Sequence, residues 1–263
     1  MRLSLILLSR IKLITFDATN TLLRFKNTVG HEYAKVASLY DVTVDTSTEK
    51  RLTNAFKQQF KTLKLEHPNF GVNTGLTTVD WWSHLVKLTF RNAGFTNISD
   101  TKLTRISSHL FKVFATAECW SLARGVLSSV RHFHLKHPSI KLGVISNTDD
   151  RLVSILYELG IGHYFDFILI SAVVKCEKPD AEMFNLALKE AGIENGEQAL
   201  HVGDSYNDDY LGAKKCGWNA LLLVKDKRLF LQSNKSDYNI KNDEIIESLE
   251  EIIDHKILYN SNK

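Results

Sequence analysis

Short apolar runs, rich in β-branched residues, recur along the chain and each ends at a polar residue or a glycine. The runs are residues 11–16, 140–146, 165–170, 199–202 and 220–224. Between them, residues 150–159 and 181–191 carry apolar side chains at the spacing of a helix that is buried on one face. Short apolar strands that alternate with such helices are typical of a parallel sheet covered on both sides. The pattern therefore predicts an α/β fold with a doubly wound, Rossmann-like sheet, in which ligands bind at the carboxyl ends of the strands.

A different pattern fills the long segment between the first two runs. From about residue 28 to residue 120 the sequence contains no clear strand pattern, and apolar residues follow helical spacing in four stretches. The stretches are residues 29–40, 52–60, 81–90 and 103–114. Residues 66–78, with Pro68 and Gly71, interrupt the pattern as a loop does. We therefore expect a helical unit over residues 25–120, inserted into a core formed by residues 1–24 and 121–263.

The two ends of the chain carry patterns of their own. Residues 1–9 contain a short apolar run after Arg2, and Arg10 and Lys12 interrupt it. The run is too short to span a bilayer, so we expect a lead-in to the first strand, with a mitochondrial presequence as the alternative. At the other end, residues 232–239 predict a polar linker followed by an amphipathic helix. The apolar face of that helix would contain Ile245, Leu249, Ile252 and Ile253.

Composition narrows the class of protein. The chain has 263 residues, of which 44% are hydrophobic and 24% charged, as in a soluble globular protein. The net charge of +3 is spread along the chain, so we expect neither a nucleic-acid partner nor an anionic membrane surface. Three cysteines, far apart and without a CxxC pair, argue against a disulfide framework or a zinc site. A reducing, cytoplasmic location fits this composition best.

Polar side chains gather where the expected strands end, in four segments. Their chemically versatile residues are Asp17, Ser146, Asn147, Lys178, Asp204, Asp208 and Asp209. A carboxylate that directly follows a buried strand, as Asp17 does, suits a nucleophile directed at an anion. The acids of residues 203–213 would repel one another unless a cation lay among them. Together these groups predict phosphoryl transfer, with Mg²⁺ bridging Asp17, Asp204 and a phosphate oxygen.

The order of these motifs resembles that of the haloacid dehalogenase-like hydrolase superfamily. The motifs are Phe-Asp-Ala-Thr-Asn-Thr-Leu-Leu, Ser-Asn, Lys-Pro-Asp and Gly-Asp-Ser with further acids, and the helical insertion is similar to the superfamily's cap. The catalytic residues that the resemblance implies are Asp17 as nucleophile, Thr19, Ser146 and Lys178. The implied contacts to phosphate are Ser146, Asn147 and Lys178. The implied metal ligands are Asp17, the backbone carbonyl of Thr19, Asp204 and Asp209, with Asp208 as the alternative to Asp209.

Position 19 departs from the pattern that the resemblance implies for a phosphatase. Phosphatases of the superfamily usually carry aspartate two residues after the nucleophile, as general acid for the leaving group and then as base for water. Threonine cannot transfer protons in this way near neutral pH, and such a step typically contributes about 10²–10⁴-fold. Threonine at this place resembles the transport ATPases, whose phosphoaspartate persists. Asn20, in place of the usual glycine, can still adopt a left-handed backbone conformation.

Three functions follow as hypotheses. The leading one is a Mg²⁺-dependent phosphatase that acts on a small phosphorylated metabolite through an aspartyl-phosphate, slowly because of Thr19. The second is a dehalogenase or phosphonate hydrolase that uses the same nucleophile, the dehalogenase without metal. The third is a catalytically weak relative that serves as a binding or regulatory module. We expect Trp81 and Trp82 to belong to the core of the helical insertion, with substrate recognition as the alternative, and the substrate and oligomeric state stay open.

Overall fold

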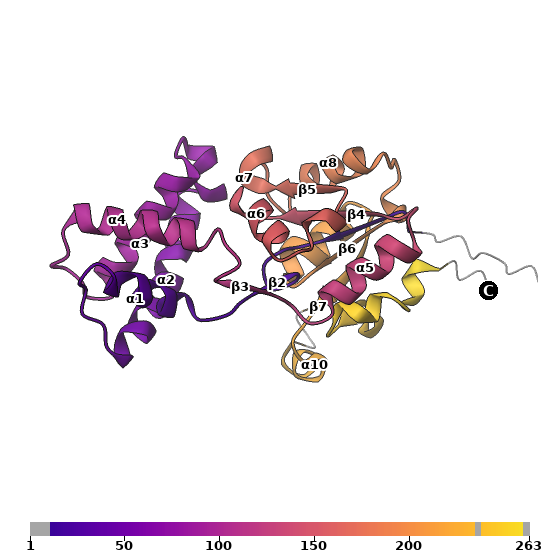
Figure 1. Cartoon of the computed structure of the whole chain (residues 1–263). Helices are drawn as coiled ribbons and strands as arrows, with labels where there is room; N and C mark the ends of the chain where they lie inside the picture. The colour runs from indigo at the N-terminus through magenta and orange to yellow at the C-terminus, as the bar shows by residue number, and fades with distance from the viewer. Residues whose placement is uncertain (1–10, 235–237, 260–263) are drawn as a thin grey trace, which may run out of the picture.

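A six-stranded parallel sheet forms the centre of the molecule (Figure 1). The computed structural model describes residues 11–234 and 238–259. Along the sheet the strands follow the order β5-β4-β1-β6-β7-β8, and every neighbouring pair is parallel. The strands are β1 (Leu13–Phe16), β4 (Lys141–Ser146), β5 (Phe167–Ile170), β6 (Ala199–Gly203), β7 (Asn219–Leu223) and β8 (Ile245–Ile246). From β1 the chain continues to β4 and β5 on one side, and from β6 it continues to β7 and β8 on the other. The strand order therefore reverses between β1 and β6, which is where such sheets bind ligands.

Helices cover both faces of this sheet. They are α5 (Val126–Lys136), α6 (Arg151–Glu158), α7 (Ser171–Val174), α8 (Ala181–Ala191), α9 (Gly212–Lys215) and α10 (Lys227–Asn234). On one face Val130 and Phe133 of α5 pack with Val144 of the sheet, and on the other Phe184 of α8 packs with Ile145. Adjacent residues of β4 thus point to opposite layers, and both are fully buried. The predicted doubly wound, Rossmann-like fold is confirmed.

Four further helices form a bundle beside the sheet, which we call the cap (Figure 1). They are α1 (Val29–Ser38), α2 (Thr46–Glu66), α3 (Thr78–Asn92) and α4 (Asp100–Val113), with a short helix η1 (Asn69–Thr74) between α2 and α3. Each of the four begins after a side chain that accepts a backbone N–H, as helix starts require. These N-caps are Thr28, Asp45, Thr77 and Ser99. The cap has its own apolar core, so the helical spacing of the sequence is explained.

Two short antiparallel strands connect the cap to the sheet, and the sequence analysis did not predict them. β2 (Leu23–Phe25) pairs with β3 (Trp120–Leu122), so the two crossings of the chain lie side by side. Each strand has three residues, which is too short for an alternating pattern to stand out. The pairing places both connections next to Asp17, and it fixes how the chain enters and leaves the cap.

The amphipathic helix expected near the C-terminus is wrong. Ile245 and Ile246 form β8, which pairs with β7 at the edge of the sheet, and Leu249 and Ile252 lie in a short 3₁₀ turn. Of the predicted apolar positions, Ile245, Leu249 and Ile252 are buried and Ile253 is half-buried, so they were recognised as apolar but assigned to the wrong element. Pairing with β7 satisfies backbone groups that a helix would have left exposed at the sheet edge. The expectations for residues 1–9 lie outside the described residues.

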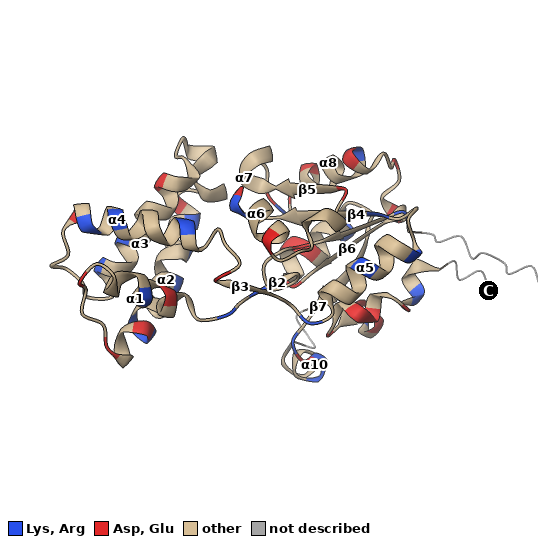
Figure 2. Cartoon of the chain, in the orientation of Figure 1, with Lys and Arg blue, Asp and Glu red and all other residues tan. Residues whose placement is uncertain are grey.

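Charge is distributed over the whole molecule. Lys, Arg, Asp and Glu are interspersed on the helices of the cap and on those around the sheet, and neither sign dominates one part (Figure 2). In the described ranges, no helix has the length and apolarity that crossing a bilayer would need. Within residues 11–234 and 238–259, the acids that lie close enough together to hold a metal ion are at the carboxyl ends of β1 and β6, where the candidate site is found.

Replacing Gly30 with alanine tests the packing of the cap. A methyl group on Gly30 would meet the backbone carbonyl of Glu49 and the hydroxyl of Thr53 on α2, so the two helices would have to separate. Such overpacking costs about 1–3 kcal/mol of unfolding free energy, whereas the helix propensity of alanine alone would add up to about 1 kcal/mol. We therefore expect Gly30→Ala to lower the urea midpoint. Lys57→Ala, at an exposed position of α2, should change stability by less than about 0.5 kcal/mol, and a stabilised Gly30→Ala would contradict the close contact.

Candidate functional site

Asp17 lies directly after β1, at the carboxyl end of the sheet. Its backbone N–H donates to the carbonyl of Val202 on β6, and Asp17 as a whole is 8% exposed. The loop that follows is closed by hydrogen bonds from Leu22 and Leu23 to the carbonyl of Ala18. Asn20 has a φ of 64°, the left-handed conformation that asparagine tolerates better than most residues. The carboxylate of Asp17 therefore stands at the end of a buried strand on a rigid turn.

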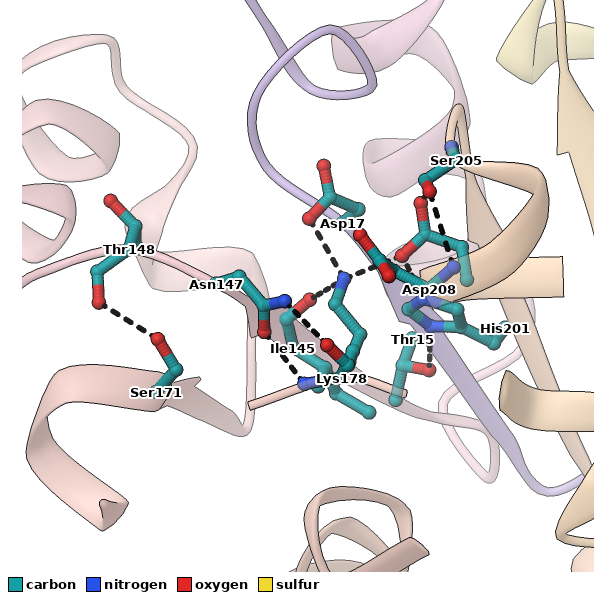
Figure 3. Close-up of polar contacts among 11 residues, drawn as sticks. Thr15, Asp17, Ile145, Asn147, Thr148, Ser171, Lys178, His201, Ser205 and Asp208 are labelled. Atoms are coloured by element: carbon teal, nitrogen blue, oxygen red, sulfur yellow. Dashed lines mark hydrogen bonds and ion pairs between the residues drawn. The ribbon is translucent and has the colours of Figure 1, made fainter. Parts of the chain in front are cut away.

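Lys178 connects the strands at this end of the sheet (Figure 3). Its ammonium donates to Asp17 Oδ1 at 2.8 Å, to Asp209 Oδ1 at 2.6 Å and to the carbonyl of Ile145 at 2.6 Å. The residue is only 3% exposed, and these bonds satisfy all three of its donors. Burial opposes the charge, but the two carboxylates outweigh it and raise the pKa of Lys178 above its usual value. Lys178 is thus a buried, permanently charged cation.

Asn147 clamps the backbone of Lys178. Its Nδ2 donates to the Lys178 carbonyl at 2.8 Å, and its Oδ1 accepts the Lys178 N–H at 2.7 Å (Figure 3). The sequence analysis assigns the Asn147 amide to phosphate, whereas the structure engages both ends of that amide with the chain. Asn147 therefore positions the lysine. Ser146, one residue earlier and 1% exposed, lines the cavity beside it.

The carboxylate of Asp17 also lies close to two other carboxylates, those of Asp204 and Asp209. One oxygen from each of Asp17, Asp204 and Asp209 lies within 4.8 Å of the other two. Of the two acids left open by the sequence, the one in this cluster is Asp209, while Asp208 is half-buried and donates its N–H to Ser205 Oγ. The short π-helix at Tyr206–Leu211 turns Asp209 toward β6, where the absence of a Cβ at Gly203 leaves room for its carboxylate. Asp209 Oδ2 also accepts the N–H of Ser205.

Burial and mutual repulsion perturb the pKa values of this cluster. Burial raises the pKa of Asp17 to about 7, and Asp209 and Asp204 add to the rise while Lys178 opposes it. Burial also raises the pKa of Asp204, with Asp209 as the next cause. For Asp209 burial is outweighed by Lys178 and His201, which hold its pKa below its usual value. One lysine against three carboxylates leaves excess negative charge, and oxygen ligands in this number suit Mg²⁺.

Two residues of the site are ones that the sequence analysis did not single out. His201 on β6 is fully buried, with Nε2 3.1 Å from Asp209 Oδ1 and Nδ1 2.8 Å from Thr15 Oγ1 (Figure 3). Burial lowers the pKa of His201, so the neutral ring donates from Nε2 to the carboxylate and accepts from the Thr15 hydroxyl at Nδ1. Thr15 and His201 are direct neighbours in the β1–β6 register. Their signal in the sequence is a polar residue inside a buried apolar run.

The expected site residues line one cavity of about 370 Å³ between the sheet and the cap. The sequence-predicted residues around it are Asp17, Thr19, Ser146, Asn147, Lys178, Asp204, Asp208 and Asp209. Thr19 bridges to Leu23 at the start of β2, on the rim of the cavity. The structure thus brings together all the residues that the sequence analysis singled out for chemistry. Their roles stay proposals.

Trp82 forms a contact between the cap and the sheet that the sequence analysis did not predict. Its Nε1 donates to Asp149 Oδ2 at 2.6 Å, just beyond β4, and Trp82 lines the cavity. Arg151 makes two hydrogen bonds to the Asp149 carboxylate, and its guanidinium carbon lies 4.6 Å from the Trp82 ring centre and 4.2 Å from that of Phe111. Trp81 is buried in a cap cluster as expected, whereas Trp82 is half-buried and faces the site.

Comparison with protein families and relatives agrees with the geometry. The family model for haloacid dehalogenase-like hydrolases matches residues 11–217. Rhythmically expressed gene 2 protein of Drosophila melanogaster is 36% identical over 248 residues, covering 92% of this chain and 94% of the relative. Haloacid dehalogenase-like hydrolase domain-containing protein 3 of Mus musculus is 35% identical over 221 residues, or 84% of each chain.

Solved structures with the same fold include a dehalogenase and a phosphatase. The 2-haloacid dehalogenase from Pseudomonas syringae pv. Tomato DC3000 has a TM-score of 0.60 at 23% identity, covering 92% of this chain and 96% of that one. The HAD phosphatase from Thermococcus onnurineus has a TM-score of 0.56 at 19% identity, with coverage of 92% and 96%. At these identities the likeness shows the shared fold alone.

The raised pKa of Asp17 predicts a pH-dependent stability difference for Asp17→Asn in EDTA. The carboxyl has a pKa of about 7 in the folded protein against 3.8 for an ordinary aspartate, so the folded state binds more protons between these values. Ionisation of Asp17 therefore lowers the unfolding free energy as pH rises from 4 to 7, and asparagine avoids this loss. We expect the variant to gain about 1–4 kcal/mol relative to wild type between pH 4 and pH 8.

Urea unfolding of both proteins at each pH measures this difference. His201, whose pKa is lowered by burial, works in the opposite direction, because its stabilising effect is lost as pH falls below 6.5. It does so in both proteins, so the difference between them isolates Asp17. A stability difference that does not change with pH would contradict the raised pKa of Asp17.

Proposed function

The chain belongs to the haloacid dehalogenase-like hydrolase family, and from that premise we propose that it is a Mg²⁺-dependent phosphatase for a small phosphorylated molecule. The observation that carries this proposal is the convergence of three carboxylates around one buried lysine. Three acids and one lysine leave more negative charge than a carboxylate that attacks a phosphate can tolerate, so a divalent cation completes the arrangement.

The donor set fits magnesium. Asp17, Asp204 and Asp209 offer carboxylate oxygens, and Thr19, whose backbone carbonyl would be a further ligand, lines the same cavity. Hard oxygen ligands, with places left for water and a phosphate oxygen, are what Mg²⁺ prefers. When bound there, the ion would offset the charge of the substrate and of the carboxylates.

Asp17 is the proposed nucleophile. Its free carboxylate oxygen attacks phosphorus, the bond from phosphorus to the leaving oxygen breaks, and that oxygen keeps the electron pair. Water then attacks phosphorus of the aspartyl-phosphate, which restores the carboxylate and releases inorganic phosphate. Lys178 lies 2.8 Å from Asp17 and opposes the rise that burial causes in the pKa of this carboxyl, which favours the ionised form that attacks. Ser146 lines the cavity where it would donate to an oxygen of the transferred group.

Thr19 shapes the expected kinetics. It stands where a phosphatase of this type would carry its proton-transferring carboxylate, and its hydroxyl does not ionise near neutral pH. Neither the departing oxygen nor the attacking water then receives help from a general acid or base at that place. We therefore infer that hydrolysis of the aspartyl-phosphate is slow, so that this intermediate accumulates.

A metal-independent dehalogenase is the main competing function. A carboxylate that attacks carbon needs no cation, so Asp204 beside Asp17 and Asp209 would add repulsion without a use. The cluster of three acids therefore favours phosphate over a carbon–halogen bond. A binding module without catalysis is favoured by Thr19 alone.

Phosphate release from a panel of phosphomonoesters, with Mg²⁺ or with EDTA, tests the proposal. We expect release by wild type with Mg²⁺, none in EDTA, and a loss of at least about 10³-fold in Asp17→Asn, because the nucleophile is gone. Asp254→Asn, an exposed site outside the cavity, is the matched control and should behave as wild type. EDTA-insensitive halide release from 2-haloacids would support the dehalogenase instead, and no turnover with beryllofluoride-dependent stabilisation would support the binding module.

Replacing Thr19 with aspartate should accelerate turnover. The new carboxylate would protonate the leaving group and then activate water, so we expect the rate of dephosphorylation to rise by about 10–10³-fold, below the full range of such catalysis because the added charge also repels the substrate. Thr19→Asn, of the same size but unable to transfer a proton, is the control. Single-turnover measurements separate formation of the aspartyl-phosphate from its hydrolysis, and an unchanged hydrolysis rate in Thr19→Asp would contradict the role of this position.

A further inference from the structure

The cavity above Asp17 changes character as it enters the cap. Around the carboxylates its wall is polar, whereas nine aromatic side chains line the remainder. Four of them, Phe60, Phe70, Trp82 and Phe111, come from four different cap segments, α2, η1, α3 and α4. The part of the cavity that these rings line is therefore continuous with the part that contains Asp17. A ligand bound at Asp17 must place its non-phosphate part among these rings.

The aromatic wall is held rigidly. Trp82 is fixed by its hydrogen bond to Asp149, and the Phe70 ring is stacked with it at 22° and 5.9 Å. Phe70 has a φ of 56°, an unfavourable backbone conformation for a bulky residue. The neighbouring Asn69 is buried and donates to the carbonyl of Ser171, which anchors this strained turn to the core. Such an arrangement presents flat π surfaces to the cavity and costs little ordering when a flat ligand binds.

The polar residues that the cap contributes to the cavity lining are few: Tyr33, Ser107 and the exposed Lys64. The charge of Arg151 is paired with the carboxylate of Asp149, and Ser107 makes hydrogen bonds to Ser83 and Thr104. The hydroxyl of Tyr33 has no hydrogen-bond partner among residues 11–234 and 238–259, although Tyr33 is 2% exposed and lines the cavity. A sugar would bury several hydroxyl groups against this wall without partners, at about 1–3 kcal/mol for each. An apolar ring with one polar substituent suits it.

The missing proton donor at position 19 gives an independent argument about the same leaving group. Without a general acid the leaving oxygen departs as an anion, so it must be a weak base. A phenol, with a pKa near about 10, meets this condition far better than an aliphatic alcohol, whose pKa is close to that of water at about 16. The aromatic wall and Thr19 thus select the same chemical group.

We propose, on the basis of the phosphatase function above, that the substrate is a small aryl phosphate whose ring lies in the aromatic part of the cavity. In the first step the Asp17 carboxylate forms the new oxygen–phosphorus bond, the aryl oxygen–phosphorus bond breaks, and the phenolate leaves with the electron pair. Solvent then protonates the phenolate, and water hydrolyses the aspartyl-phosphate. No further reactant is needed.

Four phosphate compounds separate the two arguments. They are phenyl phosphate, cyclohexyl phosphate, glucose 6-phosphate and acetyl phosphate, each assayed for phosphate release with Mg²⁺. We expect kcat/KM for phenyl phosphate to exceed those for cyclohexyl phosphate and glucose 6-phosphate by at least about 100-fold, because those two leave as strong bases. Acetyl phosphate has a good leaving group without a ring, so it measures the chemistry apart from the aromatic wall.

Variants at Trp82 test the wall itself. Trp82→Leu should lower the ratio of kcat/KM for phenyl over acetyl phosphate by about 2–13-fold, mainly through KM, because the stacking contact with the ring is lost. Trp82→Phe keeps a ring and should lose less than Trp82→Leu, which distinguishes stacking from a general disturbance of the cap. Thermal unfolding of both variants shows whether each is folded under the assay conditions.

The outcomes are distinguishable. Glucose 6-phosphate or cyclohexyl phosphate turned over as fast as phenyl phosphate would overturn the aryl substrate and leave the phosphatase standing. An unchanged phenyl-to-acetyl ratio in folded Trp82→Leu would do the same. No release from any of the four compounds, acetyl phosphate included, would overturn the phosphatase and this inference with it.

Discussion

A buried ammonium group between carboxylates is the interaction on which the site depends. Through three short hydrogen bonds Lys178 joins Asp17 after β1, Asp209 after β6 and the carbonyl of Ile145 near the end of β4. The two carboxylates raise the pKa of Lys178 despite its burial, and the loss of one partner from such a buried pair costs about 3–5 kcal/mol. Folding of the sheet and assembly of the nucleophile are therefore the same event. Asn147 and His201 support the two ends of this connection.

The sheet and the cap contribute different kinds of side chain to the cavity. Carboxylates and a lysine at the ends of the strands hold charge in a fixed arrangement, while the cap contributes apolar surface. Electrostatic interactions are stronger in such a setting than in water. The bonds from Trp82 to Asp149 and from Asn69 to Ser171 tie the two parts together across the cavity. A ligand at Asp17 is therefore in contact with both.

The sequence predicted the features that depend on local pattern. Short apolar runs identified five of the six central strands, and polar residues at their ends identified the groups around Asp17. Features that depend on tertiary contacts could not be predicted from the sequence pattern. Ile245 joins the sheet because β7 offers an unpaired edge, and Trp82 faces the site because of Asp149, 67 residues away in the sequence. Helical spacing alone could not distinguish it from Trp81, which is core.

Magnesium binding measured by titration calorimetry near pH 7.5 tests the central claim most directly, since it needs no substrate. If Asp17, Asp204 and Asp209 form a cation site, wild type should bind one equivalent of Mg²⁺, and Asp204→Asn should bind it at least about tenfold more weakly because a charged ligand is lost. Asp254→Asn, exposed and outside the cavity, should match wild type. Wild type that binds no Mg²⁺, or Asp204→Asn that binds it equally well, would contradict the account.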